Sequence, residues 1–315
     1  MTGLTCARLL QEYGFNCTVY EKSRGLGGRV STRRIEDGSN FDHGIPYINS
    51  QGAAFTKHLS TLLKDGTAQI WKPKFTSQNQ PEKTHWVVGT PYINSIFKED
   101  STSTSIKLSH HVSSVRQHKK IWVIRHTNSL KEEQEEEYNI IVLALPAPQA
   151  NKILGPTLGV SEELTKIHMN PCWALMLSFE KNIETDFDVW LEPSPQISWL
   201  GRNSSKPMRN RPRDCWVMHS TAAWAREFTN VTQAIATDKL CELLPNAIRK
   251  EVNTNTLLIS HRWLYAFPST ILKKSYCANK DKSLFAGGDW TLGKKVEDAF
   301  ASGTRIAYAI IEHYS

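Results

Sequence analysis

Four residues near the start of the chain have the types and spacing that suit a nucleotide. Glu21 follows a short apolar run, and Gly27, Gly28 and Arg29 lie in the loop just after it. A carboxylate at the end of a strand accepts hydrogen bonds from ribose hydroxyls. Glycines let the main chain approach a ligand closely, and an arginine attracts diphosphate charge. The pattern indicates dinucleotide binding, and its plainer alternative is a glycine loop with a surface arginine.

A helix and a strand must position this loop. Apolar side chains within residues 4–13 recur at helical spacing, and Gly14 supplies a helix stop. Residues 15–20 are rich in β-forming side chains and predict a strand that ends at Glu21. Helix, strand and terminal acid make up the second half of a dinucleotide-binding unit, in which Gly3 would be the last motif glycine. An ordinary amphipathic helix followed by a strand has the same texture, so this piece alone leaves both interpretations open.

Several segments resemble the signatures of the FAD-dependent amine oxidase and renalase-like flavoproteins. Residues 20–32 have the Glu and the later Gly-Gly-Arg of that family's first signature. Residues 40–48 are similar to the segment that passes the flavin ring, and residues 284–303 resemble the C-terminal FAD signature. These segments stand in the order that the family needs. The renalase-like subgroup is the most similar, because the chain is short and residues 261–266 match it in place and texture.

The resemblance implies a noncovalently bound FAD. The glycine loop would pass close to the cofactor, with Arg29 toward the diphosphate. Asp289 would bond a ribityl hydroxyl, and the backbone of Val112 would meet the adenine. The helix that begins near Val296 would point its first N–H groups at the carbonyl edge of the flavin. The full set of implied cofactor-binding residues is Gly3, Glu21, Gly27, Gly28, Arg29, Gly44, Val112, Gly288, Asp289 and Val296.

The resemblance also implies oxidation by hydride transfer to flavin N5, with dioxygen as the acceptor that yields peroxide. For the renalase-like subgroup the implied substrates are isomers of dihydronicotinamide dinucleotides. The protein then mainly orients the donor carbon, so no acid–base residue is strictly required and no catalytic residue is assigned. Candidate substrate contacts are His43, Tyr47, Trp263 and Tyr265, and for His43 a hydrogen-bonded packing role is an equal alternative.

Three other interpretations stay open. An amine oxidase or a carotenoid-type desaturase would use the same fold, although an amine oxidase calls for a Lys near N5 that the sequence does not place. The third is a non-catalytic remnant, because only Met1 and Thr2 precede Gly3, where the family has its first strand and its first two motif glycines. A misassigned start or a truncated gene would explain the same departure.

The pattern of elements predicts an α/β fold with two domains. Residues 1–65, 89–150 and 277–315 are expected to form a discontinuous Rossmann-like FAD-binding domain. Residues 66–88 and 151–276 are expected to form a second, mixed-sheet α+β substrate domain that covers the flavin.

The pattern of hydrophobic residues predicts the individual strands and helices. The run 140–145 is apolar on every residue, as expected for a parallel strand covered on both faces. The acidic run 131–137 is expected to be a solvated loop tip. A long C-terminal helix presents an apolar face over residues 296–311. Further strands are expected at 112–116, 121–124, 173–179, 197–200, 215–220, 257–264 and 283–286, and helices at 89–98 and 232–244.

Composition excludes several classes of protein. Of the 315 residues, 40% are hydrophobic and 22% are charged, which is globular composition rather than that of a disordered or coiled-coil chain. No apolar stretch approaches the roughly 20 residues of a membrane span, and the start has no signal-peptide pattern. The six cysteines are dispersed and no histidines have metal-binding spacing, so we expect a cytoplasmic protein without a metal.

The net charge of +7 favours encounters with acidic partners such as phosphates. Five cations lie within residues 202–213. The plain interpretation is a solvated hairpin loop, and the functional one is that Arg209, Arg211 and Arg213 steer a phosphate-bearing substrate toward the cleft. No stacking aromatics are interleaved there, so nucleic acid is not expected. The expected partner is a small-molecule substrate, without a membrane, and the sequence leaves the oligomeric state open.

Overall fold

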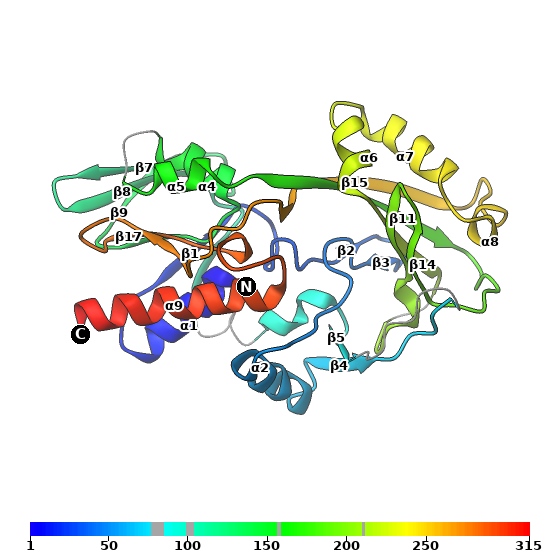
Figure 1. Cartoon of the computed structure of the whole chain (residues 1–315), viewed down its shortest axis with the longest axis horizontal. Helices are drawn as coiled ribbons and strands as arrows, with labels where there is room; N and C mark the ends of the chain where they lie inside the picture. Colours follow the sequence, from blue (N-terminus) through cyan, green and yellow to red (C-terminus); the bar gives the residue numbers. More distant parts are fainter. Residues whose placement is uncertain (77–84, 99–103, 156–158, 210–211) are drawn as a thin grey trace.

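The computed structural model describes residues 1–76, 85–98, 104–155, 159–209 and 212–315. Within them the chain has the expected α/β architecture (Figure 1), with a half built on one large antiparallel sheet and a half that contains both chain ends. The second half is called the nucleotide-binding half, after the role that the sequence predicts for it. Among the described helices, none combines the length and the apolar composition that crossing a bilayer requires. The exact division of the chain between two domains stays a prediction.

The sheet-rich half is built on one antiparallel sheet. Its strands, in spatial order, are β12 (Val189–Ser194), β13 (Ile197–Arg202), β14 (Asp214–Ser220), β11 (Met169–Phe179) and β15 (Leu257–Pro268). One face is covered by α6 (Ala222–Glu227), α7 (Gln233–Glu242) and α8 (Asn246–Arg249) (Figure 1). Leu177, Trp216 and Leu240 are among the side chains that meet between the sheet and these helices. The sequence predicted this sheet except for β12.

The nucleotide-binding half contains two separate parallel strand pairs. These are β1 (Thr18–Glu21) with β6 (Ser105–Leu108), and β10 (Ile141–Leu143) with β17 (Leu284–Ala286). β16 (Cys277–Ala278) adds an antiparallel strand outside β17. The parallel pairing of β10 confirms the prediction made from the apolar run 140–145.

The two chain ends meet in this half. Helices α1 (Thr2–Glu12) and α9 (Val296–Tyr314) lie against each other (Figure 1), and the Thr2 hydroxyl donates a hydrogen bond of 2.9 Å to the carbonyl oxygen of Ala299. Helix α9 buries Phe300, Ala307 and Ile310, which belong to the apolar face that its periodicity predicted. The N-terminus of α1 and the N-terminus of α9 are thereby brought to one region of the molecule.

A three-stranded antiparallel meander corrects one prediction. It consists of β7 (His111–His118), β8 (Ile121–Thr127) and β9 (Glu133–Tyr138). The acidic run 131–137, expected to be a loop tip, therefore mostly forms β9. Glu135 on β9 accepts hydrogen bonds from Arg125 at 3.0 Å and from Arg116 at 2.8 Å. Cross-strand ion pairs make an acidic segment acceptable in a strand.

The remaining described elements are shorter strands and helices. They are β2 (Arg33–Arg34), β3 (Asn40–Phe41), α2 (Ala53–Lys64), β4 (Ala68–Trp71), β5 (Trp86–Gly89), η1 (Ile93–Phe97), α4 (Ala147–Leu154), α5 (Ser161–Thr165), η2 (Asn203–Ser205) and η3 (Asp289–Thr291). The helix expected at 89–98 is the short 3-10 turn η1. An aromatic core fills the space beside β4 and β5, where Trp71, Trp86 and Trp199 contact one another.

The described cations of the basic run 202–213 have partners in the protein, contrary to the expectation of a solvated or free cationic loop. Lys206 and Arg209 are buried and both bind the carboxylate of Asp42, at 2.8 Å and 2.5 Å. Arg213 donates a hydrogen bond of 2.8 Å to the hydroxyl of Ser178, and Arg211 lies outside the described residues. Lys206 and Arg209 therefore hold the segment that contains Asp42 against residues more than 160 positions later in the chain.

Candidate functional site

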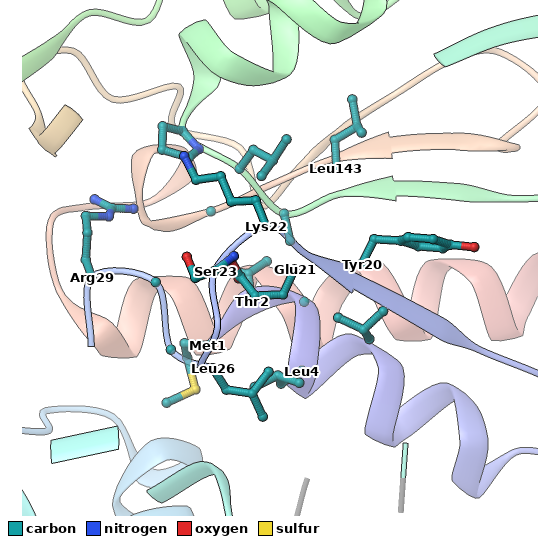
Figure 2. A pocket seen from close by; sticks show the side chains of 18 of the residues that line it. Met1, Thr2, Leu4, Tyr20, Glu21, Lys22, Ser23, Leu26, Arg29 and Leu143 are labelled. Carbon is teal, nitrogen blue, oxygen red and sulfur yellow. The ribbon is translucent and has the colours of Figure 1, made fainter. Parts of the chain in front are cut away.

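One cavity of about 2240 Å³ lies between the nucleotide-binding half and the large sheet. Side chains from the start of α1, the end of β1, the glycine loop and β10 surround part of it (Figure 2). Residues 261–266 of β15 and the N-terminus of α9 complete the lining. Pockets for single drug-sized ligands usually measure about 300–1,000 Å³, so this cavity has room for an extended dinucleotide.

The first turn of α1 presents an anion-binding end to this cavity. The helix begins at Thr2 and no side chain caps it, so the N–H groups of Thr2, Gly3 and Leu4 have no acceptor within the helix or from a capping side chain. Met1, Thr2, Gly3 and Leu4 all line the cavity. A Cβ on Gly3 would lie 3.1 Å from the Cβ of Ala144, so a glycine here lets α1 approach the segment after β10. These features fit a diphosphate at the helix N-terminus.

The glycine loop holds its shape through close backbone contacts. Gly27 has a φ of +116°, and a Cβ there would lie 2.0 Å from the carbonyl oxygen of Val30. A Cβ on Gly44 would lie 1.9 Å from the carbonyl oxygen of Arg29. Gly44 is not in the cavity lining, but its lack of a side chain lets the following segment pack against the loop, where Ile45 N–H donates to the Arg29 carbonyl at 3.0 Å.

Glu21 lies at the edge of the cavity, at the end of β1. Its carboxylate accepts a hydrogen bond of 2.8 Å from the backbone N–H of Ser23. A carboxylate has two oxygens and several lone pairs, so capacity remains for ribose hydroxyls. Val112, the implied adenine contact, also lines the cavity, on β7.

Arg29 and Asp289, both implied cofactor contacts, bind each other. The guanidinium donates two hydrogen bonds of 2.8 Å to the two carboxylate oxygens, and a third of 2.9 Å to the carbonyl oxygen of Ala266. Asp289 opens the 3-10 turn η3 directly after Gly288. Arg29, Gly288 and Asp289 all line the cavity. The ion pair joins the glycine loop to the C-terminal signature.

The N-terminus of α9 is fixed by carboxylates. Asp298 accepts a 2.8 Å hydrogen bond from the backbone N–H of Lys295, and Val296 opens the helix at the cavity wall. Glu297 accepts from the backbone N–H groups of Gln51 and Gly52 at 2.9 Å and 2.6 Å. The sequence analysis missed Glu297, although acidic residues in a first helical turn are a recognised N-terminal signal.

Two imidazoles and an indole form the far wall of the cavity. The ring centroids of His43 and His261 lie 5.0 Å apart, and Trp263 lies 5.1 Å and 4.5 Å from them. The indole N–H of Trp263 donates a hydrogen bond of 2.9 Å to the His43 carbonyl oxygen. Tyr265 lines the same cavity. Sequence analysis named His43, Trp263 and Tyr265, but did not single out His261.

Tyr47, the remaining candidate substrate contact, is not brought into this lining. Its ring stacks on Trp86 with centroids 3.8 Å apart and also contacts Trp199. Both tryptophans are buried in the aromatic core beside β4 and β5. The structure therefore gives Tyr47 a packing environment.

Burial keeps the histidines near this wall uncharged. It lowers the pKa of His43 to about 3 and that of His261 to about 4. His219, whose ring nitrogen Nε2 lies 3.1 Å from the His43 carbonyl oxygen, has its pKa lowered to about 4 by the same cause. At neutral pH the imidazoles are therefore neutral.

A buried ionic cluster lies behind this wall. Burial alone would raise the pKa of Asp42, but Lys206 and Arg209 hold it below its usual range. Burial lowers the pKa of Lys206 to about 8 against the opposing effect of Asp42. Lys206 is not in the cavity lining, and its ammonium group is committed to Asp42.

The charge of the cavity is strongly positive. Nine cationic residues line it, against the three carboxylates of Glu21, Glu137 and Asp289. The cations are Lys22, Arg24, Arg29, Arg33, Arg34, Lys152, Arg262, Lys294 and Lys295. This excess favours anionic ligands. Within the described residues no group of three or more His, Cys, Asp or Glu side chains could hold a metal ion.

Two strand edges border the cavity without a strand partner. Among the described residues, β1 pairs only with β6 on its other side, and β10 pairs only with β17. Residues 18–21 and 140–145 both line the cavity, together with Cys6 and Leu10 of α1. The parallel sheet is thus interrupted between β1 and β10.

Comparisons with known proteins agree with this arrangement. A family model described as an NAD(P)-binding Rossmann-like domain matches residues 1–65, and one described as flavin containing amine oxidoreductase matches residues 90–311. Cyclohexylamine oxidase from Brevibacterium oxydans is similar in fold, with a TM-score of 0.72 at 11% identity over 99% of this chain and 96% of its own.

Two further solved structures share the fold. A protein assigned as a protoporphyrinogen oxidase from Exiguobacterium has a TM-score of 0.74 at 10% identity, over 98% of this chain and 96% of its own. A putrescine oxidase has a TM-score of 0.67 at 12% identity, over 99% of this chain and 97% of its own. Identities this low establish similarity of fold alone.

Proposed function

Because the chain belongs to the family of flavin containing amine oxidoreductases, we propose that it is a renalase-like oxidase of dihydronicotinamide dinucleotide isomers. Membership makes it an FAD-dependent oxidoreductase that acts on a small molecule. When bound, FAD supplies the hydride acceptor at N5, and dioxygen reoxidises it with release of peroxide. The substrate, the acceptor and a cytoplasmic location are parts of the proposal, and the six free cysteines are in keeping with that location.

The residues present fit this cofactor. The uncapped start of α1 suits its diphosphate, and Glu21 at the end of β1 suits its ribose. The cavity continues from there to Val296 at the start of α9 and on to Trp263 in the large sheet. It therefore has a nucleotide end and a separate wall at which a second molecule can be placed.

The observation that carries the choice of substrate is the charge of the cavity. Nine cations against three carboxylates attract a dinucleotide, whose diphosphate is anionic, and oppose a protonated amine. Arg29 and Asp289 neutralise each other, which leaves eight cations against two carboxylates. The neutral His43 and His261 add hydrogen-bonding capacity without a compensating negative charge.

The chain's own residues would act by orientation. The wall of His43, His261 and Trp263 offers flat rings against which a dihydronicotinamide ring can stack. Holding the donor carbon of the substrate close to flavin N5 would raise the rate of hydride transfer through a high effective concentration. A charged acid or base is then not needed. The neutral imidazoles and the absence of a free carboxylate from this wall among the described residues are in keeping with that role.

An amine oxidase is the second candidate, and it is favoured by the fold similarity to cyclohexylamine oxidase and putrescine oxidase. Its requirement for an aromatic cage finds little support, because Trp71, Trp86 and Trp199 pack as core. The buried Lys206 is bound to Asp42 and lies outside the cavity lining. A desaturase and a non-catalytic remnant remain outcomes of the test below.

The test compares substrates on FAD-loaded protein. Peroxide release is measured with isomers of dihydronicotinamide dinucleotide, and in parallel with cyclohexylamine and putrescine. We expect peroxide with at least one dinucleotide isomer and none with the amines. Turnover of amines alone would replace the proposal with the amine oxidase. A protein that is colourless after incubation with FAD and inactive toward every substrate would identify the non-catalytic remnant.

A further inference from the structure

Arg33 differs from the other cations that line the cavity in being half-buried and without a partner among the described residues. It lies on β2, is half-buried and lines the cavity. Among the described residues its guanidinium has no hydrogen-bond or ion-pair partner. Arg29, four residues earlier, is bound to the carboxylate of Asp289 and to the carbonyl oxygen of Ala266. Arg34, the next residue, is exposed and lies over the ring of Tyr92 at 5.1 Å.

The surroundings of Arg33 are imidazoles rather than carboxylates. Its positive charge acts on both His43 and His261, where it adds to burial in lowering the pKa of each ring. The pairing of Arg33 with Phe41 brings β2 alongside β3, and His43 follows two residues after Phe41. His261 comes from β15 of the large sheet. Arg33 therefore lies where the glycine-loop segment meets the substrate wall.

A second unsatisfied group lies in the same wall. The ring nitrogen Nδ1 of His43 is buried and has no hydrogen-bond partner among the described residues, although His43 is only 8% exposed. Buried polar atoms are nearly always paired, and an unpaired guanidinium loses part of its hydration without compensation. An oxyanion in the cavity would pair with the guanidinium fork of Arg33, and the neutral rings of His43 and His261 in the same wall bring no competing negative charge.

We propose that Arg33, together with His43 and His261, forms a subsite for a phosphate group of the substrate. The subsite is separate from the cofactor's diphosphate, for which the start of α1 and the glycine loop are available. The proposal rests on the proposed function for the identity of the substrate. The subsite itself follows from a half-buried cation without a partner among the described residues and from two imidazole rings, 5.0 Å apart, in the same cavity wall.

The first test separates phosphate recognition from turnover. KM and kcat are measured for a dihydronicotinamide dinucleotide and for the matching dihydronicotinamide riboside, which has no phosphate. For Arg33→Gln we expect KM for the dinucleotide to rise at least about tenfold, the scale of one lost charge-assisted hydrogen bond, with kcat nearly unchanged. The riboside should be affected less than twofold. Arg33→Lys should restore part of the dinucleotide affinity, and it serves as well if Arg33→Gln does not fold.

Arg305 provides the matched control. It is exposed on α9 and outside the cavity lining, so Arg305→Gln makes the same change of charge without touching the wall. Arg305→Gln should leave both KM values within twofold of wild type. Equal effects of Arg33→Gln and Arg305→Gln on the dinucleotide would overturn the subsite.

The second test does not depend on activity. Calorimetric titration of the FAD-loaded protein with pyrophosphate should show weaker binding for Arg33→Gln than for wild type, by the same factor of about tenfold. A fall in FAD occupancy with unchanged pyrophosphate affinity would instead assign Arg33 to the cofactor and overturn the proposal. If wild type binds pyrophosphate through Arg33 but oxidises no dihydronicotinamide, the proposed function fails while the phosphate subsite stands.

Discussion

The guanidinium of Arg29 and the carboxylate of Asp289 form a two-pronged ion pair, with both hydrogen bonds at 2.8 Å. The residues are 260 positions apart, and the side chain of Asp289 is only 7% exposed. The pair therefore closes the cavity wall by joining the glycine loop to the segment before α9. Each residue was expected to contact the cofactor, and each lines the cavity while also having a strong partner in the protein.

The first prediction follows from this pair. Asp289→Asn leaves a partly buried guanidinium without its counter-charge, and breaking such a pair from one side costs about 3–5 kcal/mol when burial is complete. Because Arg29 is 26% exposed, we expect a loss nearer 2–3 kcal/mol in the free energy of unfolding, together with loss of flavin. Urea unfolding and flavin absorbance measure both.

A double-mutant cycle with Arg29→Gln isolates the interaction. We expect a coupling free energy of about 1–3 kcal/mol between the two positions. Asp238→Asn, on the exposed side of α7, is the control for the change of charge and should be nearly neutral. Additive effects of Arg29→Gln and Asp289→Asn would show that the pair does not contribute to stability.

The second prediction concerns Glu21. Its carboxylate binds the Ser23 N–H and lies at the nucleotide end of the cavity. Glu21→Gln should weaken FAD affinity by roughly 1.5–3 kcal/mol, the scale of a hydrogen bond to a charged group. Flavin retained after gel filtration is the measurement, with the exposed Glu184→Gln as control. Full flavin occupancy in Glu21→Gln would remove Glu21 from the cofactor site.

The third prediction concerns pH and the buried histidines. Burial lowers the pKa of His43 to about 3 and that of His219 to about 4, against an ordinary value of 6.5. As the pH falls below 6.5 the unfolded chain takes up protons that the folded protein refuses. The free energy of unfolding should therefore be steady above pH 7 and fall between pH 6.5 and about 4.

His219→Gln tests this assignment. The variant removes one titrating group, so the stability lost between pH 7.5 and pH 5 should shrink by up to about 2 kcal/mol relative to wild type. His313→Gln, at an exposed position in the last turn of α9, should leave the loss unchanged. A loss of stability that is the same in wild type and His219→Gln would contradict the burial of a neutral imidazole.

Local signals in the sequence predicted much of this fold. The apolar run 140–145 became a parallel strand, and the face of residues 296–311 became the inner side of α9. The glycine loop was also predictable from the sequence. Its glycines indicated a backbone that other residues rarely adopt, and Gly27 does have a positive φ. These features depend on neighbours a few positions away along the chain.

Contacts between distant residues were not readable. Lys206 and Arg209 looked like solvated cations because nothing nearby in sequence marks Asp42 as their partner. Tyr47 was predicted to contact the substrate, because nothing nearby in the sequence indicates that its ring stacks on Trp86. The acidic residues of β9 depended in the same way on Arg125 across the meander. Charge and aromatic type alone do not distinguish a ligand contact from a core partner.

The last prediction concerns the interrupted sheet. Among the described residues β1 and β10 each lack a strand partner on the edge that borders the cavity. Each open edge lacks the ladder hydrogen bonds and the packing that a neighbouring strand would supply, and total stability is only about 5–15 kcal/mol. We therefore expect the chain that begins at Met1 to be marginally stable and poorly loaded with FAD.

An extension placed ahead of Met1 tests this expectation. An apolar strand of about five residues followed by a Gly-x-Gly loop should pair with both open edges and lead into α1. Melting temperature and flavin occupancy should rise together, whereas an extension of equal length made of Gly and Ser should change neither. The start of α1 would then lie at the end of a complete phosphate-binding turn. If the chain from Met1 alone is stable and fully loaded, then Gly3 does not end a dinucleotide motif. Cofactor binding would in that case have to rest on Gly27, Gly28 and Arg29 with Gly288 and Asp289.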